Sequence, residues 1–289
     1  MDVAEVVARL GGSARTDQLL RFVTPRDLTE AVATREVERL SKGRYGLPAL
    51  GATHREAARL DATITCLSAA VEQGWEVLRQ PDRPWLAVPR NRKVDPRRRR
   101  GVHLTWSGHG GTVTSPVTTV LECARRLPFV EALGVADSAL RHGVVDLDEL
   151  QVAAAGLRGP GSPAAVRVAT HAHPLAHNPL ESALRALSLE VPGLRLVPQV
   201  PVRVDGVEIH PDLVDERLRL VVEAEGWLYH GAPDQFARDL RRYTALTVDR
   251  WTVARFGHRA ATNEQDWVVD CLRSLERTCR SRLDCRKCA

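Results

Sequence analysis

The chain has 289 residues, of which 44% are hydrophobic and 27% are charged, and its formal net charge is +5. This is the composition of a globular protein of about two domains, and no apolar run reaches the ~20 residues that a membrane span needs, so a membrane protein and a disordered chain are excluded. The N-terminus lacks the basic and apolar pattern of a secretory leader, and we expect a cytoplasmic protein. The positive charge favours an anionic partner such as nucleic acid.

Residues 1–50 predict three short helices followed by a hairpin. Thr24-Pro25 opens the third helix with Asp27 at its third position, and residues 36–47 predict strand, turn and strand. This order is typical of a winged helix-turn-helix, whose third helix enters the DNA major groove. The expected DNA contacts are the basic residues Arg26, Arg35, Lys42 and Arg44. The alternative is a module that binds protein and carries solvated arginines.

Residues 51–156 predict a second, α/β domain. Helical periodicity covers residues 54–70, 116–127 and 130–140, and strands are expected at 85–88 and 102–106. A dense group of cations lies between these strands and includes Arg97, Arg98, Arg99 and Arg100. Such a run either contacts nucleic-acid phosphates or forms a solvated loop.

Four motifs in this half follow one another in an order that is found in a known family. They are the wing Gly43-Arg-Tyr-Gly46, the turn Thr114-Ser-Pro116 and the helical segments Leu121-Glu-Cys-Ala-Arg-Arg126 and Ala136-Asp-Ser-Ala-Leu-Arg141. The N-terminal half thereby resembles the winged-helix antitoxins of AbiEi type. The resemblance implies an N-terminal winged helix that binds operator DNA, followed by an α/β domain.

Residues 157–177 predict a linker, because Gly and Pro dominate its start. His171, His173 and His177 lie close together in it. No carboxylate or cysteine accompanies them, so we do not expect a zinc site there.

Residues 178–280 predict a mixed sheet with flanking helices. Asn178 and Glu181 are a strong helix start. Apolar stretches at 196–204 and 207–214 flank the hairpin dipeptide Asp205-Gly206. A strand at 218–226, a helix at 233–248, a strand at 251–256 and a helix at 264–280 follow, so the fold class is α/β. Residues 281–289 form a basic, cysteine-containing tail.

Three carboxylates are expected to converge in this third segment. Glu223 and Glu225 share one face of their strand. A turn at Glu216-Arg217 would place Asp212 opposite Val221 and diagonal to Glu223. Like charges gathered in this way favour a hard divalent cation. The alternative is a wet edge strand whose acids pair with arginine, Arg219 or Arg241.

The C-terminal motifs resemble one superfamily in their order. They are Glu181-Ser-Ala-Leu-Arg, His210-Pro-Asp-Leu, Glu223-Ala-Glu-Gly-Trp-Leu-Tyr-His230, Phe236-Ala-Arg-Asp-Leu-Arg-Arg-Tyr243 and Trp251-Thr-Val-Ala-Arg-Phe256. This segment is similar to the PD-(D/E)xK endonuclease-like domains related to very-short-patch-repair nucleases. The resemblance implies that Asp212 and Glu223 hold Mg²⁺ or Mn²⁺, with Glu181 approaching from the first helix and His230 acting near the phosphate. Glu181 also has a structural explanation as the capping partner of Asn178.

The chain departs from the superfamily motif at its lysine. The motif commonly has Lys two residues after Glu223, where this chain has Glu225, and its only lysines are Lys42, Lys93 and Lys287. Glu225 is then an extra metal ligand, or the domain has lost cleavage. In the active interpretation the metal activates a water, and an arginine stabilises the transition state. The candidates for that arginine are Arg238, Arg241 and Arg242.

The sequence therefore predicts a Mg²⁺-dependent endonuclease that a winged helix targets to DNA. The competing hypothesis is a non-catalytic DNA-binding regulator of antitoxin type with an inactive nuclease-like domain. A cognate toxin or a repair protein is the further partner considered. Cys271 and Cys279 are expected in the core, and Cys285-x-x-Cys288 leaves a zinc site open.

Overall fold

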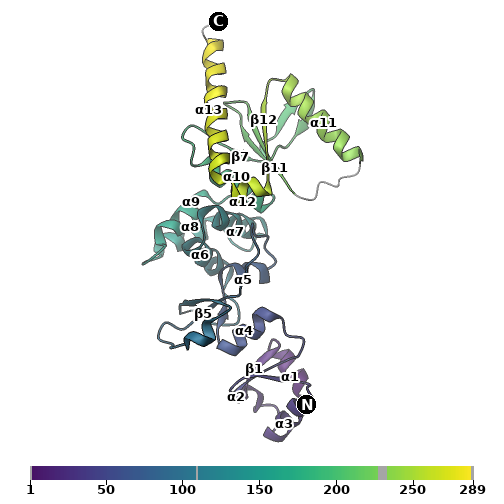
Figure 1. The fold of residues 1–289 in the computed structure, drawn as a ribbon, viewed down its shortest axis with the longest axis vertical. Coiled ribbons are helices and arrows are strands. Elements are labelled where there is room, and N and C mark those ends of the chain that lie inside the picture. Colours follow the sequence, from purple (N-terminus) through teal and green to yellow (C-terminus); the bar gives the residue numbers. More distant parts are fainter. Residues whose placement is uncertain (1, 109, 227–232, 288–289) are drawn as a thin grey trace. The chain divides into compact units, whose positions relative to one another are not determined.

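The computed structural model describes residues 2–108, 110–226 and 233–287. The chain forms two compact units, one of residues 1–73 and 80–119 and one of residues 74–79 and 120–289. Helices and small sheets occur in both, which confirms the α/β fold class (Figure 1). None of the helices in the described part of the chain combines the length and apolar character needed to cross a membrane.

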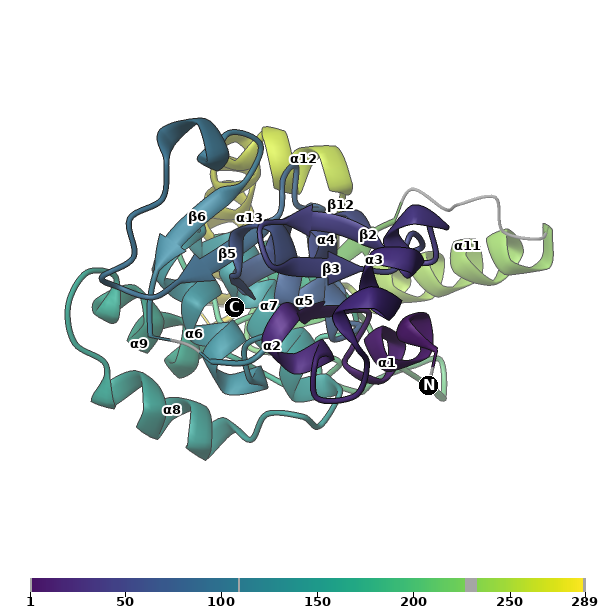
Figure 2. The same ribbon diagram turned by 90° about the horizontal axis from the view of Figure 1, so that it is seen from below.

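The first unit begins with the expected three helices and hairpin. Helices α1 (Val3–Arg9), α2 (Thr16–Leu19) and α3 (Pro25–Ala33) surround a sheet in the order β1-β3-β2. Its strands are β1 (Ser13–Arg15), β2 (Glu38–Ser41) and β3 (Arg44–Gly46), and β2 and β3 form the hairpin (Figure 2). Thr24 and Asp27 exchange hydrogen bonds at the start of α3, so the predicted capping box is confirmed.

A second small sheet follows in the same unit. It has the order β4-β5-β6, with β4 (Thr63–Ile64), β5 (Trp85–Val88) and β6 (His103–Trp106). The single helix expected at 54–70 is wrong. The chain forms α4 (Ala52–Leu60), turns at Asp61 with a φ of 49°, pairs β4 with β5, and only then forms α5 (Cys66–Glu72). Pairing with a strand distant in sequence thus interrupts a helical pattern.

The second unit contains a layer of helices that includes the expected linker. Helix α6 (Pro116–Arg126) leads into α7 (Phe129–Arg141), α8 (Leu147–Gly156), α9 (Ser162–His171) and α10 (Pro179–Ser188). The expectation of a linker at 157–177 is corrected, because α9 lies within it and buries Ala165 and Val168.

A buried ion pair joins these helices. Arg185 Nη2 on α10 lies 2.6 Å from Asp137 Oδ2 on α7, and both side chains are almost completely buried. Arg185 Nη1 also donates to the carbonyl oxygen of His171 at 2.5 Å, and Asp137 Oδ1 accepts from the His173 amide at 2.8 Å. The segment between α9 and α10 is therefore fixed by polar contacts that sequence periodicity does not show.

A mixed four-stranded sheet forms the rest of the unit, as expected. Its order is β12-β11-β10-β7, with β7 (Val197–Pro198), β10 (Leu213–Asp215), β11 (Leu220–Glu225) and β12 (Thr252–Gly257). Helix α11 (Pro233–Val248) connects β11 to β12, which run parallel, and α12 (His258–Asn263) and α13 (Gln265–Lys287) follow. The expected apolar stretches around Asp205-Gly206 divide, because β8 (Val202–Val204) and β9 (Val207–Ile209) form their own hairpin.

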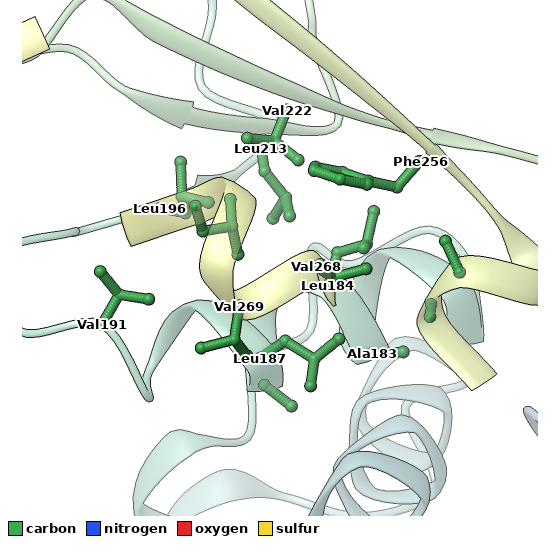
Figure 3. Packing of buried hydrophobic residues seen from close by; sticks show 14 of the residues in the cluster. Ala183, Leu184, Leu187, Val191, Leu196, Leu213, Val222, Phe256, Val268 and Val269 are labelled. Atoms are coloured by element: carbon green, nitrogen blue, oxygen red, sulfur yellow. The ribbon is translucent and has the colours of Figure 1, made fainter. Parts of the chain in front are cut away.

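Both faces of this sheet are covered. Helices α10 and α13 pack on one face, where Leu184, Val222 and Val268 are buried together (Figure 3). On the other face, Leu246 of α11 packs with Val214 and Val221. The alternation of side chains along β11 therefore divides its residues between two cores.

Replacing Asp137 with alanine is expected to lower the free energy of unfolding by about 3–5 kcal/mol, because Arg185 remains buried without its partner. Urea denaturation checks this. The double replacement Asp137→Leu with Arg185→Met is expected to recover most of the loss, since it removes both charges. A loss of less than ~1 kcal/mol in Asp137→Ala contradicts the buried pair.

Candidate metal and phosphate site

The site forms where β10 and β11 pair. The register joins Leu213 to Val222 and Asp215 to Leu220. Continued by one residue, it places Asp212 across from Glu223, so the predicted position opposite Val221 is wrong by two residues. Because the shift is even, both carboxylates stay on the predicted face.

A buried aspartate sets this register. Asp215 is 1% exposed and closes a longer turn than expected: Oδ1 accepts from the Leu218 amide at 3.3 Å, and Oδ2 accepts from Arg217 Nη2 at 2.7 Å. The Arg195 amide donates to the same Oδ2 at 2.8 Å. Sequence reasoning assigned no role to Asp215.

Asp212 and Glu223 lie next to each other with different surroundings. Asp212 is half-buried, and its Oδ2 accepts from the Ala224 amide at 2.8 Å. Glu223 is 2% exposed, and its Oε1 has no hydrogen-bond partner among the described residues. Arg242 Nη2 lies 3.3 Å from that oxygen as an ion pair without hydrogen-bond geometry.

The environment of Glu223 favours its protonated form. Burial raises its pKa to about 8, and the neighbouring Asp212 carboxylate adds to the rise, while the Arg242 guanidinium opposes it. Protonation of Glu223 reduces its repulsion with the Asp212 carboxylate when no cation is bound between them. The oxygen without a hydrogen-bond partner, Oε1, is the one that a cation could contact.

Glu181 lies beside this pair but has a complete set of structural partners. It is 1% exposed, Oε2 accepts from the His177 amide at 2.9 Å and from Gln199 Nε2 at 3.2 Å, and Oε1 accepts from Asn178 Nδ2 at 2.6 Å. Burial raises its pKa to about 7, with Asp212 contributing. The structural explanation of Glu181 therefore accounts for all of its contacts.

Gln199 is a site residue that sequence reasoning missed. Its backbone amide donates to the carbonyl oxygen of Asp212 at 3.1 Å, while its side-chain amide donates to Glu181 Oε2. Its φ of 56° lies in the left-handed region. The signal in the sequence was a single amide side chain within the apolar stretch at 196–204.

Glu225 faces an arginine of the neighbouring strand. Its Oε1 accepts from Arg255 Nε at 2.6 Å and from the Tyr243 hydroxyl at 3.2 Å. Of the expected arginine partners, Arg219 pairs instead with Asp249, and Arg241 lines a cleft that Arg242 also lines, with no ion pair to these acids among the described residues. Arg255 is a second residue that sequence reasoning missed.

The remaining predicted residues are spread over several places. All three helix arginines, Arg238, Arg241 and Arg242, line a cleft of about 460 Å³ between α11 and the β8–β9 hairpin, and Arg242 also pairs with Glu223. His230 lies outside the described residues, as does Cys288. Cys271 and Cys279 pack in the core as expected.

The carboxylates of Asp212 and Glu223 suit one hard cation with few protein ligands, not a centre with many. No group of three His, Cys, Asp or Glu side chains arranged for a metal occurs among the described residues, the three histidines at 171–177 included. Mg²⁺ is commonly held by one or two carboxylates together with water and substrate phosphates. Asp212 and the unsatisfied Oε1 of Glu223 fit that requirement.

Of the basic residues predicted to contact DNA within residues 1–50 of the first unit, three are exposed and one forms an ion pair. Arg26, Arg35 and Lys42 are exposed, whereas Arg44 forms an ion pair with Asp61. Burial and the nearby Arg15 lower the pKa of Arg44.

The arginine-rich connection between β5 and β6 is partly ordered by its own guanidinium groups. Arg98 donates to the carbonyl oxygen of Arg59 at 2.6 Å, and Arg99 donates to that of Val94 at 2.7 Å. Arg97 and Arg100 are exposed.

No protein-family model matches the chain. Two curated proteins of Mycobacterium tuberculosis are each 32% identical to it over 147 residues: Uncharacterized protein MT2308 (strain CDC 1551 / Oshkosh) and Uncharacterized protein Rv2248 (strain ATCC 25618 / H37Rv). The match covers 50% of this chain and 54% of each relative, so the chain spans about half their length. Among solved structures, the RV2827C protein from Mycobacterium tuberculosis is 13% identical with a TM-score of 0.35, over 71% of this chain and 88% of that chain. That similarity supports no conclusion about fold or function.

The stability of the protein in chelating buffer is expected to fall as pH rises. Between the ordinary glutamate pKa of 4.5 and the folded value of about 8, the folded state binds more protons at Glu223 than the unfolded state does. The resulting stabilisation is complete below the lower value and is lost as pH passes through the upper one. Glu223→Gln cannot titrate, so its melting temperature should exceed that of the wild type by an amount that grows with pH.

Differential scanning calorimetry over this pH range measures the effect. The matched control is Glu216→Gln, which changes an exposed glutamate in the β10–β11 turn. A melting-temperature difference between Glu223→Gln and the wild type that is constant with pH contradicts the raised pKa.

Proposed function

We propose that the protein is a cytoplasmic, divalent-metal-dependent nuclease that hydrolyses phosphodiester bonds in DNA. The observation that carries the proposal is the pairing of Asp212 with Glu223 across β10 and β11, with one buried glutamate oxygen unsatisfied and Arg242 beside it. A buried acid with a strongly raised pKa next to a second acid is characteristic of functional sites.

Asp212 and Glu223 would hold Mg²⁺ or Mn²⁺. When bound, the ion supplies Lewis-acid stabilisation of phosphate charge and lowers the pKa of a coordinated water. In the hydrolysis, a water oxygen bonds to phosphorus while the bond from phosphorus to the leaving sugar oxygen breaks. The water gives up a proton and the leaving oxygen takes one.

Arg242 is an arginine of α11 that forms an ion pair with Glu223. Its guanidinium lies within 3.3 Å of Glu223 Oε1 and donates to the Tyr243 hydroxyl at 2.9 Å. A guanidinium held in this way can donate two parallel hydrogen bonds to phosphate oxygens. We assign Arg242 to stabilisation of the negative charge that develops on the phosphate.

DNA targeting is assigned to the first unit. The order of α1, α2, α3 and the β2–β3 hairpin is that of a winged helix. Exposed basic residues on α3, after it and in the wing are available to phosphates: Arg26, Arg35 and Lys42. Arg97 and Arg100 offer a second basic surface between β5 and β6.

A non-catalytic DNA-binding regulator is the second candidate. The pairing of Glu225 with Arg255 favours it, because this acid is already neutralised. A cognate toxin or a repair protein would then be the natural partner of the second unit.

Cleavage assays distinguish the two candidates. The wild type is expected to cut supercoiled plasmid or single-stranded oligonucleotides with Mg²⁺ or Mn²⁺ and to stop in chelator. The isosteric variants Asp212→Asn and Glu223→Gln should each lower the rate by about 10²-fold or more, since each removes a ligand charge. Glu216→Gln is the control. Sequence-specific binding without cutting of any of these substrates supports the regulator.

The two wing cations are expected to differ in DNA binding. Lys42 is exposed, whereas Arg44 has a side chain 16% exposed and is paired with Asp61. Lys42→Ala should therefore reduce the slope of log affinity against log salt by about 1, and Arg44→Ala should leave this slope unchanged. Fluorescence anisotropy on labelled duplex DNA measures both. An equal effect of the two variants contradicts the assignment.

A further inference from the structure

We propose that Arg255 supplies a positive charge that holds the substrate phosphate beside Asp212 and Glu223, and that Glu225 positions this arginine instead of binding the metal ion. The inference rests on the proposed function and deepens it. It gives roles to two residues, one of which the sequence left without any assignment and the other of which stands where related motifs have lysine.

The strand register places Arg255 with the acids. In the parallel pairing of β11 with β12, Glu223 is the partner of Arg255, and Glu225 is the partner of Gly257. Partnered residues of adjacent strands point to the same face of a sheet, as do residues two apart in one strand. The Arg255 guanidinium therefore belongs to the same face as the carboxylates.

Glu225 uses a single oxygen for its contacts with Arg255. Oε1 lies 2.6 Å from Nε and 2.5 Å from Nη2 of that residue, and it also accepts from Tyr243. Hydrogen bonds between two charged groups are short and strongly oriented. An oxygen bound in this way is a poor metal ligand, because the guanidinium repels a second cation at that atom.

Tyr243 gathers two guanidinium groups over one ring. The Arg255 Cζ lies 4.3 Å and the Arg242 Cζ 4.9 Å from the ring centroid. Cation–π attraction and the two acids offset the repulsion between the two arginines. The arrangement keeps two guanidinium groups close together, one of them paired with Glu223 and the other with Glu225.

The cluster of Asp212, Glu223, Glu225, Arg242 and Arg255 would carry excess positive charge, and so favour an anion, once a divalent ion was bound to Asp212 and Glu223. Glu223 is the acid paired with Arg242, and a divalent ion on Asp212 and Glu223 competes with that arginine for the same oxygen. Arg242 then lacks its anionic partner, and Arg255 retains Glu225. Because the side chain of Arg255 is 44% exposed against 22% for Glu225, the guanidinium is the accessible member of its pair. A phosphodiester can then accept hydrogen bonds from both guanidinium groups, those of Arg242 and Arg255.

The test uses the full chain and the p-nitrophenyl ester of thymidine 5′-phosphate, a phosphodiester too small to require the winged helix. Arg255→Ala should lower kcat/KM by about 10²-fold with a raised KM, while Arg255→Lys loses only about tenfold. The double variant Glu225→Lys with Arg255→Ala should recover about tenfold over Arg255→Ala, since the cation then projects from the same face of β11. Arg273→Ala, which removes an exposed arginine paired with Asp270, is the matched control.

Binding of labelled hexathymidylate, measured by anisotropy in Ca²⁺ and in chelator, gives a readout that does not depend on turnover. The variants share an unchanged first unit, so differences in affinity report on the second. Arg255→Ala should weaken binding about tenfold relative to Arg273→Ala. Glu225→Gln should leave the half-saturating Mg²⁺ concentration for cleavage unchanged.

The outcomes separate this inference from the nuclease proposal. Cleavage by Arg255→Ala equal to that of Arg273→Ala overturns the inference and leaves the nuclease in place. A raised half-saturating Mg²⁺ concentration in Glu225→Gln overturns the positioning role. A wild type that cuts neither the ester nor DNA overturns the nuclease, and hexathymidylate affinity alone then decides whether Arg255 binds phosphate.

Discussion

The repulsion between Asp212 and Glu223 is the constraint on which the surrounding structure depends. Two carboxylates on adjacent strands, one of them almost fully buried, cannot both be charged without compensation. The protein responds with an amide donor from Ala224 to one acid and the Arg242 guanidinium beside the other. One oxygen of Glu223 is nevertheless left unsatisfied among the described residues, and this incomplete compensation is the reason that we propose a site here.

Much of the local structure could be predicted because it is encoded over short distances. The capping residues Thr24 and Asn178 and the dipeptide Asp205-Gly206 act within a few residues of themselves, and each forms the predicted helix start or turn. Which residues of β11 share a face was also predictable, because side chains alternate along any strand and the apolar run indicates the strand.

The details that build the site could not be predicted in this way. The register of β10 on β11 depends on Asp215, whose burial becomes visible only when Arg195 and Leu218 surround it. The partner of Glu225 comes from a strand 30 residues further along the chain, and a helix lies between them. The supposed linker is likewise ordered by Asp137 and Arg185, which lie 48 residues apart.

Competition for one oxygen links these features. A proton, the Arg242 guanidinium and, on the proposed function, a divalent ion all seek Oε1 of Glu223. Burial disfavours the bare carboxylate and raises the pKa of Glu223 to about 8, so the proton competes with both cations. On the proposed function, an ion bound at this oxygen would displace the proton and would compete with Arg242 for the same atom. On that proposal the ion would neutralise the acids while the Arg242 guanidinium became available, so metal binding and phosphate binding would be coupled.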